Sequence, residues 1–218
     1  MSASAATDLE ALVTGVLRDI PDFPKPGVVF KDITPLLAAP EAFAAVIADM
    51  ADRNEGRIDL VAGIEARGFV LGAALAHAMG VGFIPIRKAG KLPGRTAAIS
   101  YDLEYGSATI EVHADDIAQG HRVLLVDDVL ATGGTALAAW DLLTHVGAEV
   151  TGFEVVVDLS FLGGRQRLAR LGLVAADLGK DGIDGVGHRQ GSGTGENCLF
   201  MCKSRAGTGT AGKPAGSM

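Results

Sequence analysis

The sequence contains few cysteines, few aromatic residues and no excess of basic charge. With only two cysteines in 218 residues a disulfide framework is excluded, and a reducing compartment, the cytoplasm, is expected. The 26 acidic and 19 basic residues leave a formal net charge of −7, whereas surfaces that bind nucleic acid are usually basic. No apolar run approaches the ~18 residues of a membrane span, and no signal peptide is visible at the N-terminus. We therefore expect neither a nucleic-acid partner nor a membrane partner.

Hydrophobic residues, in contrast, make up 48% of the chain and follow two alternating patterns. Short apolar runs predict buried strands at 58–64, 81–86, 108–112, 122–127 and 150–158. Apolar residues at helical spacing predict helices at 7–19, 43–50, 68–79, 134–146 and 165–171, the first with a capping box at Thr7 and Glu10. Strands that alternate with helices form βαβ units. The predicted fold is therefore α/β, a single domain over residues 1–173 with a mainly parallel sheet flanked by helices.

Three segments depart from this alternation. Prolines and Gly27 predict a stiff loop at 20–35. Residues 87–95 combine basic side chains with glycine and proline, which predicts a long mobile loop leading into 99–104. The segment 174–218 is rich in glycine and poor in large apolar residues, so we expect it to be disordered. It contains Cys198 and Cys202, whose spacing lacks the second ligand pair of a typical zinc site.

The most specific feature of the sequence is a strand, two acids and a small-residue turn at 123–135. The apolar run Val123–Val126 precedes Asp127 and Asp128, and the turn Ala131–Thr135 then opens a helix. In open α/β sheets, ligands bind beyond the carboxyl ends of the strands. The turn presents backbone N–H groups at a helix N-terminus, which favours an anion, and its glycines allow a phosphate to approach closely.

This segment is neither of the common nucleotide-binding loops. It lacks the lysine of G-x-x-x-x-G-K-[ST] and the three glycines of G-x-G-x-x-G. A phosphate-binding turn preceded by two acids suits a phosphorylated sugar, because the carboxylates can accept hydrogen bonds from its hydroxyls. The alternative is a threonine-capped turn with two loop acids, which is disfavoured because adjacent acids after a buried strand are costly without a partner.

Residues 123–135 resemble the signature with which type I phosphoribosyltransferases bind 5-phosphoribosyl 1-pyrophosphate (PRPP). Four further segments narrow the resemblance to the adenine phosphoribosyltransferases: Pro21–Pro35, Gly63–Phe69, Arg87–Pro93 and Tyr101–Gly106. The resemblance covers roughly residues 20–171 and leaves the glycine-rich segment outside. It implies a type I phosphoribosyltransferase fold with a small N-terminal hood at about 20–37. It also implies the reaction of adenine with PRPP to give AMP and pyrophosphate in purine salvage.

Roles on the PRPP side follow from this resemblance where the motifs match. Asp127 and Asp128 would hold the ribose hydroxyls. The 5′-phosphate would lie on the turn formed by Ala131, Thr132, Gly133, Gly134 and Thr135. Pyrophosphate would contact a loop with a cis peptide before position 66 and a mobile basic loop, namely Glu65, Ala66, Arg67, Arg87, Lys88 and Lys91. Taken alone, Arg67 also fits a surface salt bridge, and the basic run also fits a solvated face.

The resemblance also implies roles on the acceptor side. Glu104 would be the acid/base residue near the purine N7, and Tyr105 would cover the site when the loop closes. Adenine would be bound by four residues of the hood and the opposite wall, Val29, Phe30, Lys31 and Leu159. Lys31 stands where relatives often carry arginine, which matters little for a main-chain contact. Taken alone, Glu104 also fits an ordinary strand-end glutamate, and Phe30 also fits simple core packing.

Mg2+ is the cofactor that the resemblance implies. PRPP would supply most of the ligands, so no direct protein ligand is expected, and Asp127 or Asp128 would contact the ion only indirectly. Basic groups in a closed, dry site would stabilise the departing pyrophosphate. The resemblance further implies a homodimer. Two alternatives stay open: another purine specificity, such as xanthine or hypoxanthine, and a non-catalytic regulator that senses PRPP.

Overall fold

The structure is a computed structural model that describes residues 3–23, 26–102, 106–170 and 175–176 of the 218-residue chain. The predicted site residues Glu104 and Tyr105 lie outside the described residues. The same holds for Cys198, Cys202 and the glycine-rich segment 174–218 apart from its residues 175–176. The other predicted site residues can be placed in the fold.

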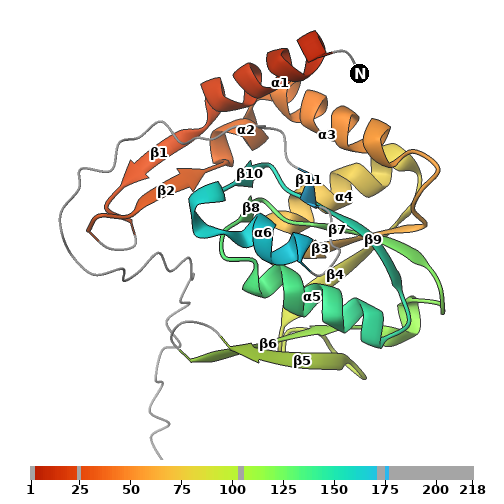
Figure 1. The fold of residues 1–218 in the computed structure, drawn as a ribbon. Coiled ribbons are helices and arrows are strands. Elements are labelled where there is room, and N and C mark those ends of the chain that lie inside the picture. Colours follow the sequence, from red (N-terminus) through yellow and green to blue (C-terminus); the bar gives the residue numbers. More distant parts are fainter. Residues whose placement is uncertain (1–2, 24–25, 103–105, 171–174, 177–218) are drawn as a thin grey trace, which may run out of the picture.

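A seven-stranded sheet forms the centre of the molecule, in the order β11-β9-β7-β3-β4-β6-β5 (Figure 1). The parallel strands are β3 (Leu60–Ile64), β4 (Gly82–Lys88), β7 (Arg122–Val126), β9 (Glu149–Glu154) and β11 (Ala175–Ala176). At the β4 edge, β5 (Ala97–Asp102) and β6 (Ser107–Val112) add an antiparallel hairpin. The predicted α/β class with a mainly parallel sheet is confirmed.

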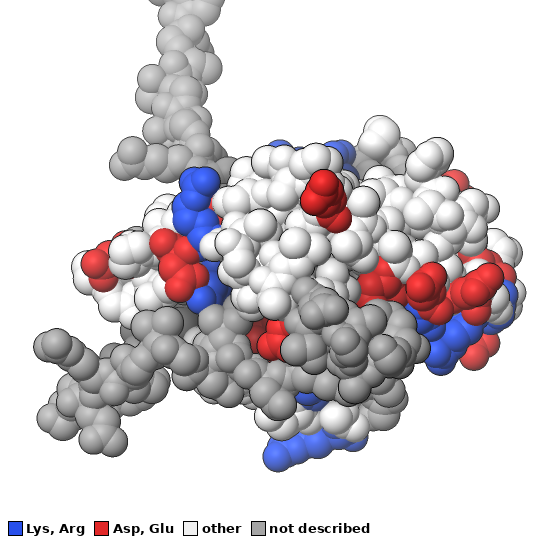
Figure 2. Space-filling view, turned by 90° about the horizontal axis from the view of Figure 1, so that it is seen from above, with Lys and Arg blue, Asp and Glu red and all other residues white. Residues whose placement is uncertain are grey.

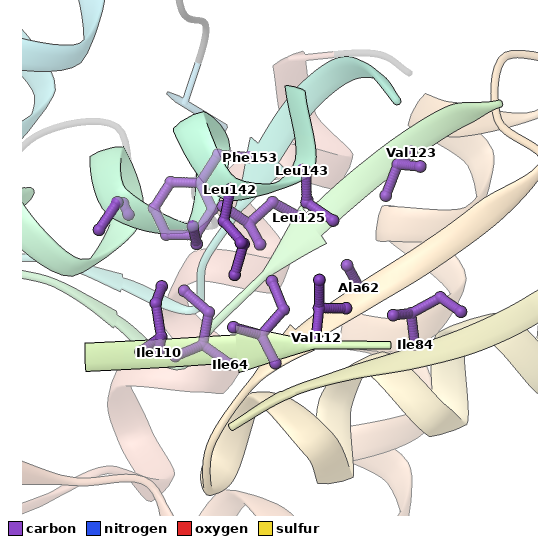
Figure 3. Close-up of a cluster of buried hydrophobic side chains, with 14 of the residues drawn as sticks. Ala62, Ile64, Ile84, Ile110, Val112, Val123, Leu125, Leu142, Leu143 and Phe153 are labelled. Atoms are coloured by element: carbon purple, nitrogen blue, oxygen red, sulfur yellow. The ribbon is translucent and has the colours of Figure 1, made fainter. Parts of the chain in front are cut away.

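Helices cover both faces of this sheet. α3 (Pro40–Asn54) and α4 (Arg67–Met79) pack on one face, and α5 (Gly134–His145) packs on the other. The sequence of β7 is a continuous apolar run because both faces of the strand are buried. Val123 and Leu125 belong to the core cluster under α5, whereas Leu124 and Val126 belong to the cluster under α3 and α4. Figure 3 shows the cluster under α5, in which side chains of the helix and the strands gather.

The remaining elements lie at the ends and edges of this layered core. They are α1 (Ala3–Val16), β1 (Arg18–Pro21), β2 (Val29–Asp32), α2 (Thr34–Ala38), β8 (Val129–Leu130), β10 (Val157–Asp158), α6 (Gly164–Ala169) and the 3-10 turns Ala114–Asp116 and Ser160–Leu162. β1 and β2 form an antiparallel hairpin, and β8 pairs with β10 in parallel. In Figure 1 the hairpin and α1 form the N-terminal layer at the top of the molecule.

The structure corrects the predictions for the N-terminal region. α1 begins at Ala3 and ends at Val16, so Thr7 lies inside the helix and does not cap it. The predicted loop at 20–35 is instead a hairpin, with Pro21 opposite Val29, followed by α2. Proline marks the chain breaks correctly, but the pairing of two four-residue strands depends on contacts that local patterns do not reveal.

Three further boundaries differ from the predictions. β4 continues to Lys88 and β5 begins at Ala97, so the connection between them is shorter than the loop predicted from 87. The predicted strand at 150–158 is divided into β9 and β10, which belong to different sheets. β11 pairs with β9, so the sheet extends past the predicted domain end at 173.

Glycines bring α4 unusually close to the sheet. A Cβ at Gly68 would lie 2.6 Å from the carbonyl oxygen of Val126, and a Cβ at Gly63 would lie 2.5 Å from the carbonyl oxygen of Gly68. Real side chains do not make such contacts, so only glycine permits this packing. The first turn of α4 is thereby held against the end of β7.

The surface around the N-terminal layer carries mixed charges. Figure 2 shows this face as mostly uncharged in the described part of the chain, with acidic and basic side chains side by side near its edges.

None of the described helices is long and apolar enough to cross a membrane.

A buried ionic network joins α3 to β9. Glu154 is only 3% exposed. Its carboxylate accepts hydrogen bonds from Arg53 Nη2 at 2.8 Å and from Asn54 Nδ2 at 2.9 Å. Arg53 also pairs with Asp49 one helical turn earlier. A buried carboxylate is tolerated here because its oxygens are paired and hydrogen-bonded.

We predict that Arg53→Ala destabilises the protein by about 3–5 kcal/mol, because it leaves Glu154 buried without its cation. Urea unfolding at neutral pH measures this loss. Arg57→Ala is the matched control, since the Arg57 side chain is exposed and, within the described part of the chain, its hydrogen bond is to the Arg53 carbonyl, at 3.4 Å. Equal shifts for the two variants would show that the network does not stabilise the fold.

Candidate functional site

Three neighbouring strands, β7, β3 and β4, end at the same edge of the sheet. Asp127 and Asp128 follow β7, residues 65–67 follow β3, and Arg87 with Lys88 completes β4. Backbone hydrogen bonds continue the sheet into these segments: Glu65 N donates to Ile86 O at 2.9 Å, and Asp127 N donates to Glu154 O at 3.1 Å. Parallel pairing therefore gathers predicted site residues that lie far apart in the sequence.

Asp127 and Asp128 form the acidic centre of this edge. The Asp128 side chain is buried, and its Oδ2 lies 2.5 Å from Arg67 Nε, at ion-pair distance but without hydrogen-bond geometry. The backbone N–H of Asp128 donates to Asp127 Oδ1 at 2.9 Å. Burial, together with the neighbouring Asp128 charge, raises the pKa of Asp127 well above its usual range. Burial also raises the pKa of Asp128, and the Arg67 charge opposes this shift.

Arg67 links this acidic centre to the N-terminal hairpin. It is the first residue of α4, and the peptide bond between Glu65 and Ala66 just before the helix is cis, as the resemblance implied. Its guanidinium carbon lies 5.3 Å from the centroid of the Phe30 ring on β2. A cation over an aromatic face is attracted by the ring quadrupole. One guanidinium thus contacts both the hairpin and Asp128.

The predicted phosphate turn lies at the N-terminus of α5. Gly133 has φ +80°, a left-handed conformation that glycine adopts without strain, and it forms the N-cap of the helix. No side chain caps this end, so the turn leaves its first N–H groups for an anion. Thr135 Oγ1 accepts a hydrogen bond from Tyr101 on β5 at 3.2 Å. Ala131, Thr132 and Gly134 complete the turn and are partly exposed.

The predicted basic residues surround the end of β4. Glu65 Oε2 accepts hydrogen bonds from Arg87 Nε at 3.3 Å and from the backbone N–H of Lys88 at 3.1 Å. Arg87 Nη1 also donates to the carbonyl oxygen of Lys91 at 3.1 Å. The Arg87 guanidinium lies 6.0 Å from the Phe69 ring centroid. Arg87 is therefore positioned beside Glu65, while Lys91 lies in the following turn.

The predicted adenine-binding residues occupy different environments. Val29 is exposed on β2, and the Phe30 ring meets the Phe23 ring edge-on at a centroid distance of 5.3 Å. Lys31 is buried and its Nζ pairs with Asp19 across the hairpin at 2.6 Å. This pairing engages the side chain of Lys31, and its predicted main-chain contact with adenine stays a prediction. Leu159 is a buried core residue whose N–H donates to Leu130 O at 2.9 Å, next to the phosphate turn.

Sequence reasoning missed three residues that support the site. Tyr101 contacts the predicted phosphate turn through its hydrogen bond to Thr135, whereas the sequence indicates it only as the first residue of the Tyr101–Gly106 motif. A Cβ at Gly164 would lie 2.1 Å from the carbonyl oxygen of Ala131, so α6 begins directly against the turn. Arg165 then pairs with the buried Asp158 at 2.6 Å. The pair of glycines at 163–164 was the available signal, but glycine alone does not reveal which segment lies against it.

The arrangement as a whole defines the class of protein. A phosphate turn and two acids lie beyond the carboxyl end of one parallel strand, and basic residues follow the next two strands. This is the fold of a type I phosphoribosyltransferase, with the predicted site residues gathered at one edge of its sheet. The family model described as the phosphoribosyl transferase domain matches residues 32–166, and the chain belongs to this family of pentosyl-transferring enzymes.

Several proteins that are similar to this chain in sequence or structure carry the name of one activity. The adenine phosphoribosyltransferase of Frankia casuarinae is 60% identical over 174 residues, covering 79% of this chain and 93% of that protein. The Thermobifida fusca protein of the same name is 56% identical, covering 78% and 97%. The crystal structure of adenine phosphoribosyltransferase from Thermoanaerobacter pseudethanolicus has a TM-score of 0.73 and 46% identity, covering 78% of this chain and 98% of its own. The Saccharomyces cerevisiae enzyme, solved with adenine and a bisphosphate ligand, has a TM-score of 0.73 and 37% identity, covering 81% and 99%.

We predict that Asp127→Asn stabilises the ligand-free protein at neutral pH. A carboxyl with a raised pKa in the folded state contributes stability only below its unfolded pKa and loses it as the pH rises through the folded pKa. Asparagine removes the ionisation but keeps the Oδ1 that accepts the Asp128 N–H. One unit of pKa shift is worth about 1.4 kcal/mol, or roughly 3–6 °C in Tm for a chain of this size.

Thermal unfolding of the variant and the parent across pH 4 to 8 checks this prediction. The Tm advantage of Asp127→Asn is expected to grow with pH. An advantage that is constant or shrinks as the pH rises would contradict the assignment of an unfavourable charge to Asp127.

Proposed function

We propose that this protein is an adenine phosphoribosyltransferase that converts adenine and PRPP into AMP and pyrophosphate in purine salvage. The observation that carries the proposal is the position of Arg67, whose guanidinium contacts the Phe30 ring and lies beside Asp128. The resemblance assigns these three residues to the pyrophosphate, base and ribose parts of one reaction. Their convergence on a single side chain is what a transfer between base and sugar requires. The relatives named for this activity add independent support.

In this mechanism the residues at the sheet edge bind the donor. Asp127 and Asp128 accept hydrogen bonds from the ribose hydroxyls, and the turn 131–135 binds the 5′-phosphate. The glycosidic C1′–O bond to pyrophosphate breaks as the bond from adenine N9 to C1′ forms, with inversion at C1′. Arg67, Arg87, Lys88 and Lys91 stabilise the negative charge that develops on the departing pyrophosphate.

The acceptor side of the mechanism rests on the hood and on the 101–106 segment. Main-chain groups of Val29 and Lys31 read the purine edge, and Phe30 and Leu159 line its faces. Glu104 shares a proton with the purine N7 while N9 attacks C1′, so that positive charge does not build up on the ring. Tyr105 covers the site when the loop closes. Closure excludes water, which strengthens the electrostatic interactions with pyrophosphate.

The acidic pair also fits the divalent cation implied by the family. Asp128 Oδ2 accepts no hydrogen bond from the described residues. Burial raises the pKa of both acids, and positive charge nearby would favour their ionised forms. Among the described residues, no group of three or more His, Cys, Asp or Glu side chains could hold a metal. On the resemblance we propose that PRPP would hold most of the Mg2+ ligands and that Asp127 or Asp128 would contact the ion only indirectly; the ion would supply positive charge that offsets the charge of the pyrophosphate.

Two further properties are proposed. On the resemblance, the enzyme acts as a homodimer, and on its cysteine content it acts in the cytoplasm. The few cysteines of the chain fit a reducing compartment.

Base specificity provides the direct test of the proposed function. Purified protein is supplied with PRPP, Mg2+ and each of adenine, hypoxanthine, guanine and xanthine, and nucleotide formation is followed for all four. We expect kcat/KM for adenine to exceed the other values by at least about 100-fold, because a site built for one hydrogen-bonding edge strongly rejects the wrong one. Preference for another purine would overturn the adenine assignment. PRPP binding without turnover of any base would favour the PRPP-sensing regulator.

A second prediction tests the phosphate turn. Gly164→Ala places a methyl group against the Ala131 carbonyl and is expected to displace the turn, raising KM for PRPP by about tenfold or more. Gly15→Ala is the matched control, because a Cβ there meets nothing within 4 Å. Steady-state kinetics at saturating adenine measures the effect. An unchanged KM for PRPP in Gly164→Ala would exclude a role of this contact in shaping the turn.

A further inference from the structure

Glu111 is a buried acid that the predicted site does not include. It lies on β6, opposite Arg87 of β4 and Ala98 of β5 in the strand register, and is 5% exposed. A carboxylate in this position adds negative charge beside a segment proposed to bind a polyanion. Such an acid is unfavourable for the site unless it has a structural partner.

The partners of Glu111 are the backbone of the basic turn itself. Its Oε1 accepts hydrogen bonds from the N–H groups of Lys91 and Leu92, both at 2.8 Å, and its Oε2 accepts one from Thr96 Oγ1 at 3.3 Å. These hydrogen bonds, the one from Leu92 first, lower the pKa of Glu111, so the side chain is ionised at neutral pH. The turn is folded around a fixed negative charge.

The turn that contains Lys91 and Leu92 also positions Arg87. The carbonyl oxygen of Lys91 accepts a hydrogen bond from Arg87 Nη1 at 3.1 Å, while Glu65 Oε2 holds Arg87 Nε at 3.3 Å. The N–H of Ala89 donates to Thr109 on β6 at 2.9 Å, which fixes the start of the same turn. Two acids from different segments therefore determine where the guanidinium lies: Glu65, which follows β3, contacts it directly, and Glu111 on β6 holds the turn that it contacts.

We propose that Glu111 is a positioning residue for pyrophosphate: it holds the Lys91–Leu92 backbone so that Arg87 and Lys91 face the leaving group. Its own charge is satisfied by N–H and O–H donors and does not compete for the two basic side chains. This inference rests on the proposed function, because the role of the basic turn comes from it. It predicts a defect specific to the pyrophosphate part of the donor.

The test compares three substitutions at this position with a control. Glu111→Ala removes all three contacts, whereas Glu111→Gln keeps an Oε1 acceptor for both N–H groups. Glu111→Asp keeps the charge but is too short to reach the turn, and it serves if the alanine variant does not fold. Asp115→Ala is the control, since Asp115 is an exposed acid in the same region whose ion pair, among the described residues, is with the exposed Arg95.

Glu111→Ala and Glu111→Asp are expected to raise KM for PRPP by about 10- to 100-fold and to leave KM for adenine within about threefold. Glu111→Gln is expected to recover most of the PRPP affinity, and Asp115→Ala to behave as the parent. Equal changes in both KM values, or a glutamine variant as defective as alanine, would refute the positioning role, because a general loss of structure affects both substrates.

Binding of pyrophosphate with Mg2+, measured by calorimetry, separates this inference from the proposed function. If the parent forms no AMP, the proposed function fails, and the binding comparison still decides the role of Glu111. Weaker pyrophosphate binding by Glu111→Asp than by Asp115→Ala supports the inference. Equal binding by the two variants overturns it.

Discussion

The position of Arg67 depends on a close contact between α4 and the end of β7. Gly68 follows Arg67, and its missing side chain allows the first turn of α4 to touch the backbone at Val126. Only at this distance does the guanidinium reach the buried carboxylate of Asp128. Without that cation, two adjacent acids would be held at the end of a buried strand with nothing to offset their repulsion.

The rest of the site shows the same internal compensation of charge. Arg67 lies beside Asp128, Arg87 lies beside Glu65, and Glu111 is enclosed by backbone N–H groups. Asp128, Glu65 and Glu111 thus each have a partner within the described part of the protein. Under the proposed function, a sugar pyrophosphate would offer hydroxyls to Asp128 and negative charge to Arg67 and Arg87. The protein is preorganised because the partners come from the ends of fixed strands.

Much of this arrangement could be predicted from the sequence because the decisive signals are local. The apolar run before Asp127 and the small-residue turn after it specify a strand, two acids and a helix start within a few residues, and the structure has all three. Other elements could not be predicted in this way. The sequence pattern predicts a loop where β1 and β2 form a hairpin, because these strands are short and separated by prolines. Glu111 resembles any other strand residue until the turn that surrounds it is known.

The sequence alone establishes the family and its local features: paired acids, a glycine-containing turn, a basic run and the alternation of the main strands and helices. It determined them because each is encoded by residues adjacent in the chain. Only the tertiary structure decided which of these groups meet. Parallel pairing of β7, β3 and β4 placed Asp128, Arg67 and Arg87 at one edge, and close glycine packing set the distance between α4 and β7. Such contacts join residues far apart in sequence, and their geometry follows from packing rather than from any local pattern.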